Sequence, residues 1–280
     1  MKLLRYGPVG QELPGMLDAQ GRLRALSPAI GDISPELLSP QGLAVLAAID
    51  PQKLPLVEGA PRLGTPVAGI GQIHAVGLNY RKHALESGMP IPEEPILFSK
   101  AISSLSGPDD DIVIPSGAKS VDWEAELGVV IGTEAYQVSE ADALNHVAGY
   151  MTVNDVSERD YQIRRGGQWV KGKSLPGFCP LGPWLVTRDE VADPQALSVR
   201  LEVNGEVMQD GATSDMIFGV ASLVSYMSGF FRLMPGDVIV TGTPSGVGMG
   251  RKPPKYLAPG DIVTVEVSGL GRQTQKIRAQ

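Results

Sequence analysis

The segment that most constrains the fold covers residues 121–132 and has the sequence VDWEAELGVVIG. Its apolar content is typical of a buried β-strand, yet it contains Glu124 and Glu126. Because side chains alternate between the two faces of a strand, these glutamates share one face and the apolar residues beside them share the other. Two like charges against a core are costly unless a positive group compensates them. A divalent cation is the simplest compensation, so we expect further oxygen ligands elsewhere.

The composition indicates an ordinary globular protein with many turns. Of its 280 residues, 42% are hydrophobic and 20% are charged, which is sufficient for a substantial core. Glycine (34 residues) and proline (23 residues) are abundant, so short strands are expected rather than long helices. The formal net charge is -7 and no cluster of Lys and Arg occurs, which argues against a nucleic-acid partner.

Targeting and redox features favour a cytoplasmic protein. The chain lacks a run of about 18 apolar residues, so we expect no membrane span. The N-terminus has no apolar core long enough for a secretory signal. The single cysteine, Cys179, excludes an internal disulfide and any zinc cluster built from several cysteines.

Two domains are expected. Residues 1–65 alternate short apolar pieces with Gly/Pro turns and contain no reactive cluster, so we interpret them as a small N-terminal domain. Residues 66–280 contain the candidate functional residues and are interpreted as a catalytic domain. Strands are expected at residues 2–6, 15–17, 22–26, 73–78, 95–100, 111–115, 121–132, 146–156, 184–187, 198–203, 206–210, 237–241, 262–267 and 273–277. Helices are expected at residues 34–38, 42–49, 80–87, 139–145, 158–165, 213–219 and 220–231.

A candidate general base lies on the short helix predicted at residues 80–87, for which Asn79 is a plausible N-cap. His83 and Glu86 are spaced i and i+3, so they share one helical face. This spacing suits a histidine whose proton is managed by a carboxylate, although a solvated surface pair has the same spacing. The Pro-rich loop at residues 88–95 is suited to act as a lid.

Further polar residues follow strands or lie in predicted loops. Asp155 comes at the end of a strand. An Asp in this position can be a functional-site residue or a residue that only forms a turn. Lys171 and Lys173 lie in a predicted loop. One of them could bind an anionic substrate, and the alternative for each is a lysine exposed to solvent. His74, inside a strand, is interpreted as a core residue rather than a ligand.

The Gly-rich segment at residues 242–250 follows a predicted strand. Its backbone N–H groups could bind a carboxylate or an oxyanion. It lacks the Gly-Lys-Ser/Thr ending of a phosphate loop and the Gly-x-Gly-x-x-Gly spacing of a dinucleotide site.

Three acidic residues therefore stand out as a candidate metal site: Glu124, Glu126 and Asp155. With only three histidines and one cysteine in the chain, a typical zinc or copper site is poorly supported. Carboxylate oxygens favour Mg²⁺, Mn²⁺ or Ca²⁺. Three such ligands leave about three octahedral positions open, which suits a bidentate 2-oxo acid.

The motifs, taken in their order, resemble the fumarylacetoacetate hydrolase family from about Gly71 to the C-terminus. They are GLNYRKH at 77–83, DWEAEL at 122–127, NDVSERD at 154–160, GQW at 167–169 with KGKS at 171–174, and TGTPSGVG at 241–248. The opening section also resembles the small N-terminal domain of bacterial members.

The resemblance implies an α+β, mostly β fold, namely a mixed β-sheet roll, and a homodimer. It also implies Mg²⁺ or Mn²⁺ held by Glu124, Glu126 and Asp155. The implied catalytic residues are His83, Glu86 and Lys173, with Arg159, Gln162 and Thr243 near the substrate. Many relatives have a Lys-Ser-x-Asp-x-Phe pattern, whereas this chain has Pro176 at the Asp position, which changes the contacts of that loop.

The activity expected from the resemblance is hydrolysis of a carbon–carbon bond in a 2,4-diketo acid, giving pyruvate and a carboxylic acid. Acylpyruvates and diketo-deoxy sugar acids are the candidate substrates, and similarity to bacterial sugar-acid enzymes favours the latter. Decarboxylases, isomerases and ureidoglycolate-lyase-like enzymes are alternatives on the same metal site. A non-enzymatic, metal-stabilised protein is the third possibility.

Overall fold

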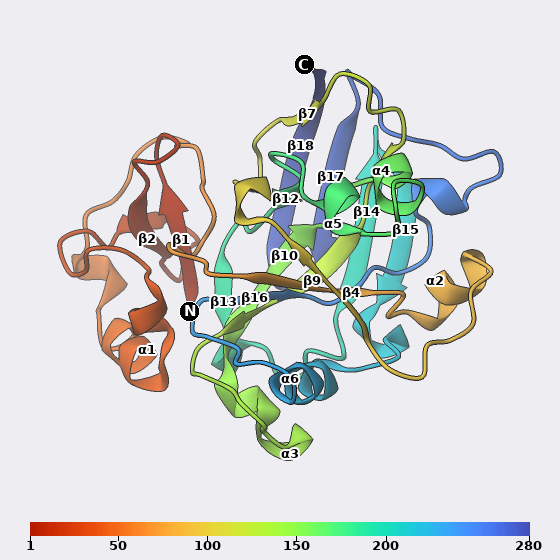
Figure 1. The fold of residues 1–280 in the computed structure, drawn as a ribbon. Helices are drawn as coiled ribbons and strands as arrows, with labels where there is room; N and C mark the ends of the chain where they lie inside the picture. The colour runs from red at the N-terminus through yellow and green to blue at the C-terminus, as the bar shows by residue number, and fades with distance from the viewer.

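The structure, a computed structural model, describes residues 1–280 and is a mostly β protein of mixed α/β composition (Figure 1). Its larger sheet has nine strands, in the spatial order β3 (Leu23–Ala25), β2 (Leu13–Leu17), β1 (Lys2–Tyr6), β13 (Leu185–Thr187), β10 (Val147–Asn154), β9 (Ala125–Ile131), β16 (Val238–Val240), β4 (Ile73–Gly77) and β5 (Ile96–Lys100). All neighbours pair antiparallel except β16 and β4, which are parallel. The fold class predicted from the sequence is confirmed.

A second sheet has five strands, in the order β15 (Glu206–Ala212), β14 (Ser198–Val203), β17 (Ile262–Val267), β18 (Gly271–Ala279) and β7 (Ile112–Ile114). Two small sheets pair β8 (Val121–Asp122) with β11 (Ser157–Glu158) and β6 (Leu105–Ser106) with β12 (Cys179–Pro180). The predicted Asn204-Gly205 hairpin between β14 and β15 is present, and both residues have positive φ, as a type I′ turn requires.

The helices are short. The α-helices are α1 (Pro40–Ala47), α2 (Arg81–Glu86), α3 (Glu140–Ala143), α4 (Arg159–Ile163), α5 (Val170–Lys173) and α6 (Val220–Ser228). The 3₁₀ helices are η1 (Pro35–Leu38), η2 (Pro51–Lys53), η3 (Ile102–Ser104), η4 (Leu144–His146), η5 (Arg188–Glu190), η6 (Thr213–Asp215) and η7 (Gly248–Gly250). No helix of this structure is long and apolar enough to span a bilayer.

Strands β9 and β10 lie at the centre of the molecule and are buried along their whole length. Leu127 and Val129 of β9 belong to a core that also contains Leu201 and Val265 of the second sheet. The other face of the nine-stranded sheet packs on a second core. Because both faces are covered, a carboxylate on β9 is taken out of water wherever it points.

The opening section is joined to the rest of the molecule by the larger sheet. Strand β1 pairs with β13, Leu3 opposite Leu185, so that β1, β2 and β3 extend this sheet at one edge (Figure 1). Leu26, Leu38 and other residues of this section fill the second core together with residues of β4 and β16. The division at residues 65 and 66 stays a prediction.

Four predicted elements differ from the structure. The acidic strand is interrupted: β8 ends at Asp122 and β9 begins at Ala125, because side-chain amides and not a neighbouring strand bind the backbone N–H groups of Glu124 and Ala125. Residues 170–173 form helix α5 rather than a loop, and of residues 213–219 only Thr213–Asp215 are helical. Asn79 does not cap α2; its side chain instead bonds the backbone of Phe218 and Thr241.

Candidate active site

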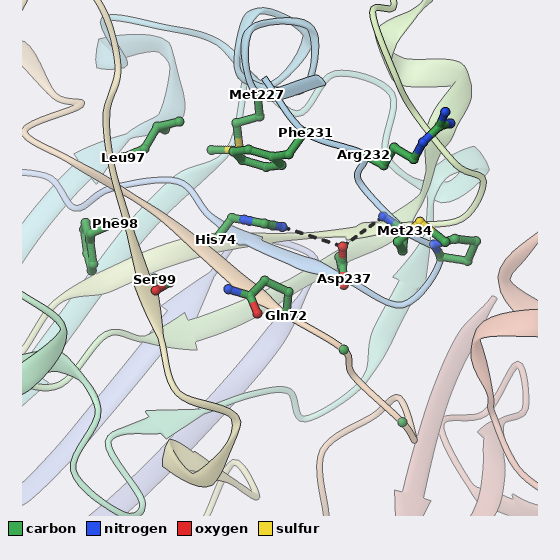
Figure 2. A pocket seen from close by; sticks show the side chains of 13 residues that line it. Gln72, His74, Leu97, Phe98, Ser99, Met227, Phe231, Arg232, Met234 and Asp237 are labelled. Carbon is green, nitrogen blue, oxygen red and sulfur yellow. Dashed lines mark hydrogen bonds and ion pairs between the residues drawn. The ribbon is translucent and has the colours of Figure 1, made fainter. Parts of the chain in front are cut away.

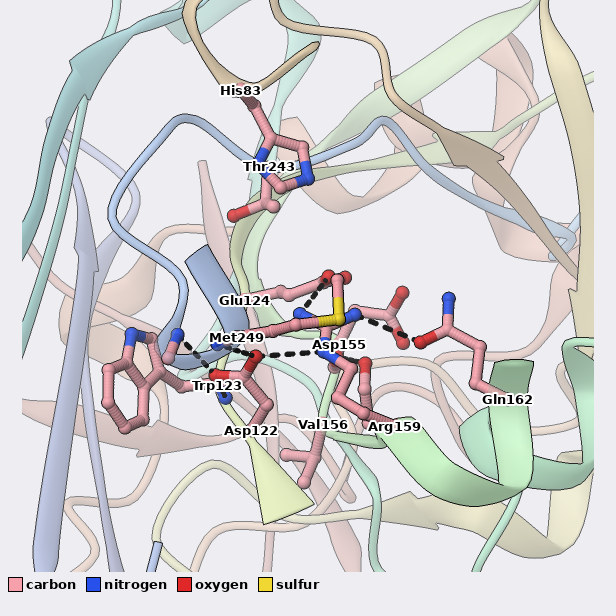
Figure 3. A network of polar contacts seen from close by, with 12 residues as sticks. His83, Asp122, Trp123, Glu124, Asp155, Val156, Arg159, Gln162, Thr243 and Met249 are labelled. Carbon is pink, nitrogen blue, oxygen red and sulfur yellow. Dashed lines mark hydrogen bonds and ion pairs between the residues drawn. The ribbon is translucent and has the colours of Figure 1, made fainter. Parts of the chain in front are cut away.

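Three carboxylates converge at the ends of the central strands. Glu124 precedes β9, Glu126 lies on β9 opposite Val153 of β10, and Asp155 follows β10. A backbone bond of 2.9 Å from Asp155 N to Glu124 O fixes the two segments together. The three side chains are buried, and each contributes one oxygen within 4.8 Å of the others. Figure 3 shows two of them, Glu124 and Asp155, beside Arg159. Glu124 and Glu126 point away from the core that contains Trp123 and Leu127, as the alternation predicted.

Buried cations surround this cluster. Lys173 Nζ lies 2.5 Å from Glu124 Oε2 and 2.7 Å from Asp155 Oδ2, and Arg159 Nη2 lies 2.7 Å from Glu124 Oε1. Burial raises the pKa of Glu124, but the charges of Lys173 and Arg159 outweigh it and hold the pKa below the ordinary carboxyl value. Burial raises the pKa of Glu126 well above its ordinary value, and the charges of Asp155 and Glu124 raise it further.

The cluster fits a divalent cation. The ion pairs of Lys100, Lys173 and Arg159 reach Glu124 and Asp155 but not Glu126, which accepts a hydrogen bond from the backbone N–H of Gly242. One oxygen from each carboxylate lies within 4.8 Å of the other two. Two oxygens bound to one Mg²⁺ or Ca²⁺ are at most two metal–oxygen bonds apart, each about 2.0–2.6 Å long, so this spacing is compatible with a shared ion. All three ligands are hard oxygen donors, so Glu124, Glu126 and Asp155 could hold such an ion.

Lys100, the last residue of β5, belongs to this cluster although sequence analysis did not single it out. It is 1% exposed, and its Nζ donates to Asp155 Oδ1 at 2.5 Å and to the backbone carbonyl of Lys173. The two oxygens of Asp155 are therefore bound by two different lysines. A lysine at the end of a strand that begins with three apolar residues was the only signal of it in the sequence.

The predicted general-base pair is present on α2. His83 Nδ1 lies 3.2 Å from Glu86 Oε2, and both side chains are largely buried. With the Nδ1 proton donated to Glu86, His83 Nε2 is free to accept a proton. Gly246 N donates to Glu86 Oε1 at 2.9 Å, so the same carboxylate joins α2 to the Gly-rich segment.

The Gly-rich segment 242–250 binds carboxylates of the protein itself. Gly242 N donates to Glu126 Oε2 at 2.5 Å, and Gly248 N donates to Asp122 Oδ1 at 2.7 Å. The Gly246 N–H likewise donates to Glu86. These three N–H groups, which the sequence suggested could bind the carboxylate or oxyanion of a ligand, are therefore hydrogen-bonded to the protein itself. Asp122, which sequence analysis also missed, further accepts a 2.8 Å bond from Arg159 Nε.

Arg159, Gln162 and Thr243, the three residues expected near the substrate, line one cavity together with Glu124 and Glu126. Arg159 Nη1 donates to Gln162 Oε1 at 3.0 Å, which orients the amide (Figure 3). Thr243 Oγ1 donates to Ala125 O at 2.9 Å and accepts from Gln209 Nε2 at 2.7 Å, so its hydroxyl proton is committed to the protein. Lys171 lies apart: its Nζ donates to the carbonyl of Arg165 at the surface.

One cavity of about 390 Å³ brings these groups together. Its lining includes seven of the predicted site residues, namely His83, Glu124, Glu126, Arg159, Gln162, Lys173 and Thr243. Glu86 and Asp155 contact this set directly, through His83 and Lys173. The size is at the lower end of the range for small-molecule sites, about 300–1,000 Å³.

A larger cavity of about 660 Å³ lies elsewhere and contains none of these residues (Figure 2). His74 lines it, stacked on Phe231 at a ring distance of 4.8 Å and 3.6 Å from the carboxylate of Asp237. His74 is therefore separate from the acidic cluster, but its side chain is 13% exposed on the wall of this cavity and is not the core residue expected from the sequence. We assign the candidate active site to the smaller cavity because the acid, base and cation groups meet there.

Comparisons with known proteins identify the family of this chain. Residues 72–278 match the family model described as fumarylacetoacetate (FAA) hydrolase C-terminal. The chain belongs to the fumarylacetoacetate hydrolase family. A Burkholderia multivorans relative, to which a hydrolase function is provisionally assigned, is 57% identical over 280 residues, covering 100% of this chain and 99% of its own.

Solved structures extend the similarity. Fumarylacetoacetate hydrolase from Exiguobacterium antarcticum is 35% identical with a TM-score of 0.87, and all of both chains is covered. 5-carboxymethyl-2-hydroxymuconate delta-isomerase from Mycobacterium smegmatis is 33% identical with a TM-score of 0.77, covering 100% of this chain and 99% of that one. Maleylpyruvate hydrolase from Sphingobium sp. SYK-6 is 27% identical with a TM-score of 0.82, again over all of both chains. These neighbours include hydrolases and an isomerase on one fold.

Proposed function

We propose that this protein hydrolyses a carbon–carbon bond in a 2,4-diketo acid, with Mg²⁺ or Mn²⁺ at Glu124, Glu126 and Asp155. The observation that supports this most is the position of the His83–Glu86 pair on the same cavity as the acidic cluster and Lys173. A base and a buried cation on one cavity are what attack by water and departure of an enolate require.

A divalent cation held by Glu124, Glu126 and Asp155 would act as an electrophile toward the 2-oxo carboxylate end of the substrate. His83 Nε2 takes a proton from water, and Glu86 stabilises the resulting imidazolium. The hydroxide attacks the distal ketone, the bond between that carbon and the adjacent methylene breaks, and the electron pair remains on the methylene as a pyruvate enolate. Lys173 stabilises the negative charge, and the proton held by His83 passes to the methylene carbon of the enolate, which gives pyruvate plus a carboxylic acid.

The test is release of pyruvate from a panel of 2,4-diketo acids by the Mg²⁺-loaded protein. His83→Ala and Glu86→Gln should lower kcat by about 100-fold or more, since general-base catalysis contributes roughly 10²–10⁴-fold. Absence of pyruvate from the whole panel, with metal bound, would contradict hydrolysis.

Isomerisation of a 2-oxo acid on the same site is the second candidate, supported by the similarity to the Mycobacterium smegmatis isomerase. Proton transfer at carbon needs no attacking water. A His83→Ala variant that kept full turnover of an isomerase or decarboxylase substrate would therefore favour this candidate. Homodimer formation stays a proposal that size-exclusion chromatography with light scattering tests: a dimer has twice the 29.6 kDa of one chain.

A further inference from the structure

The charged side chains that line the active-site cavity are buried and form its floor, whereas its apolar side chains, except Val76, are half-buried or exposed and form its outer part. The floor consists of the carboxylates and cations already described. The outer part is lined by Leu78, Met89, Phe98, Ile163, Trp169 and Met249. A 2-oxo acid whose carboxylate end lies on the floor would place its distal group against these side chains.

The outer wall is held in place by packing. Trp169 lies so close over Gly77 of β4 that a Cβ on Gly77 would come within 2.2 Å of Trp169 Cζ3. The indole also packs edge-on against Phe98 of β5, with the ring centres 5.3 Å apart. Lys173 Nζ lies 5.2 Å from the Phe98 ring, so floor and wall adjoin at this residue. The aromatic surface is therefore a built part of the site.

The polar groups that line the cavity offer little to a polar distal group. Its two permanent cations, Lys173 and Arg159, are both paired with carboxylates of the protein. The Thr243 hydroxyl is engaged on both sides, so apart from His83 the uncharged polar side chains left in the lining are those of Ser87, Gln162 and Trp169. A second carboxylate or a row of hydroxyls would lose its water without gaining a matching partner.

We propose that the distal acyl group of the substrate is neutral and apolar, with Met89, Ile163 and Trp169 as residues that determine this specificity. The proposal rests on the proposed function, since it concerns the group released as the carboxylic acid. It favours an acylpyruvate with an alkyl or aryl tail over a diketo sugar acid and over a diketo dicarboxylate. Met89 and Ile163 are each 50% exposed, so an apolar tail also removes their surface from water.

A series of tail lengths follows from the same argument. Each methylene buried against the wall should raise kcat/KM about fourfold until the cavity is filled, the factor that burial of one CH₂ provides. A tail that projected into water instead would leave kcat/KM independent of its length.

Binding tests the proposal separately from catalysis. We would titrate three six-carbon 2-oxo acids into the Mg²⁺-loaded protein by calorimetry: 2-oxohexanoate, 2-oxoadipate and 2-oxo-3-deoxygluconate. In their open-chain forms they share the metal-facing end and differ only in a methyl, carboxylate or hydroxyl-bearing tail, and none has the second ketone needed for cleavage. Because 2-oxo-3-deoxygluconate forms cyclic hemiketals in water, its affinity is calculated for the open-chain fraction measured by NMR. 2-oxohexanoate should bind roughly tenfold to a hundredfold more tightly than the others, the cost of one or two unpaired polar groups. Equal affinities, a preference for either polar tail, or no binding of any of them would overturn the proposal.

A matched pair of variants locates the effect. Ile163→Ser should lower the preference for 2-oxohexanoate, whereas Leu85→Ser, which changes a 71% exposed side chain outside the cavity lining, should keep it. Equal loss in both variants would contradict the role of Ile163. Pyruvate release from 2,4-diketo acids is measured in parallel. Pyruvate release together with tighter binding of a polar tail would contradict only the proposed tail specificity. Tighter binding of the apolar tail without any pyruvate release would contradict only the proposed hydrolysis.

Discussion

Replacement of Lys100 by methionine tests how the acidic cluster is balanced. Methionine preserves most of the aliphatic stem but removes the ammonium that donates to Asp155 Oδ1 at 2.5 Å and to the Lys173 carbonyl. Both Lys100 and Asp155 are 1% exposed, so the carboxylate would remain buried with one partner fewer. Removing one partner of a buried ion pair costs about 3–5 kcal/mol. The metal-free variant should therefore melt roughly 6–10 °C below the wild type.

A divalent cation should recover part of this loss. In Lys100→Met the cluster has one positive charge fewer, so an added cation compensates more negative charge than in the wild type. Because a ligand that binds the folded state stabilises it by an amount that rises with the logarithm of its affinity, the increase in Tm on adding Mg²⁺ should be larger in the variant.

Differential scanning calorimetry with EDTA and with saturating Mg²⁺ measures both effects. Lys53→Met is the matched control, because Lys53 is 84% exposed and its nearest carboxylate, on Asp50, is 4.0 Å away. The control should change stability by no more than about 0.5 kcal/mol. A metal-free Lys100→Met protein as stable as the wild type, or a smaller Mg²⁺ shift than in the wild type, would refute the reasoning.

Two further changes have defined outcomes. Burial raises the pKa of Tyr150 from 10.0 to about 12, so its contribution to stability is complete below pH 10 and is lost as the pH rises to about 12. The free energy of unfolding, measured by urea titration at each pH, should therefore fall less between these pH values for Tyr150→Phe than for the wild type. An identical dependence on pH in the two proteins would contradict the raised pKa of Tyr150. Gly77→Ala should displace Trp169, since the new Cβ would lie 2.2 Å from its ring. The kcat/KM for an apolar acylpyruvate should then fall at least tenfold, whereas the affinity for Mg²⁺ should be retained. An unchanged kcat/KM would show that Trp169 does not shape the site.

The sequence predicted those parts of the site that follow from local periodicity. The alternation at Glu124 and Glu126 and the i, i+3 spacing of His83 and Glu86 each depend on one short segment. The structure shows both arrangements. Asp155 was grouped with them as a third oxygen ligand at a strand end, and the resemblance to known motifs implied the same three ligands.

Contacts between distant segments were not predictable in this way. Lys100 and Asp155 are 55 residues apart, and Gly248 N and Asp122 are 126 residues apart. A lysine at a strand end or an aspartate in a turn has no local pattern that indicates burial. The Gly-rich segment illustrates the consequence: its free N–H groups indicated an anion, but the anions are Glu86, Asp122 and Glu126 of the chain itself.

Helix α5 was missed for a related reason. Gly172 lies at its centre, and glycine disfavours helices by about 1 kcal/mol relative to alanine. In the structure a Cβ on Gly172 would lie 2.4 Å from Glu158 O, so the close approach of α5 to α4 and β11 requires glycine there. Tertiary packing, which brings Lys173 to the carboxylates, outweighs the local propensity.

The central claim is that Glu124, Glu126 and Asp155 together bind one divalent cation. Crystals grown with Mn²⁺ and measured for anomalous scattering test it most directly, because the peak identifies the ion and its ligands at once. We expect one strong peak per chain within bonding distance, about 2.0–2.6 Å, of an oxygen from each of the three residues. No peak between these carboxylates at saturating Mn²⁺, or a peak bound by other residues alone, would contradict the account.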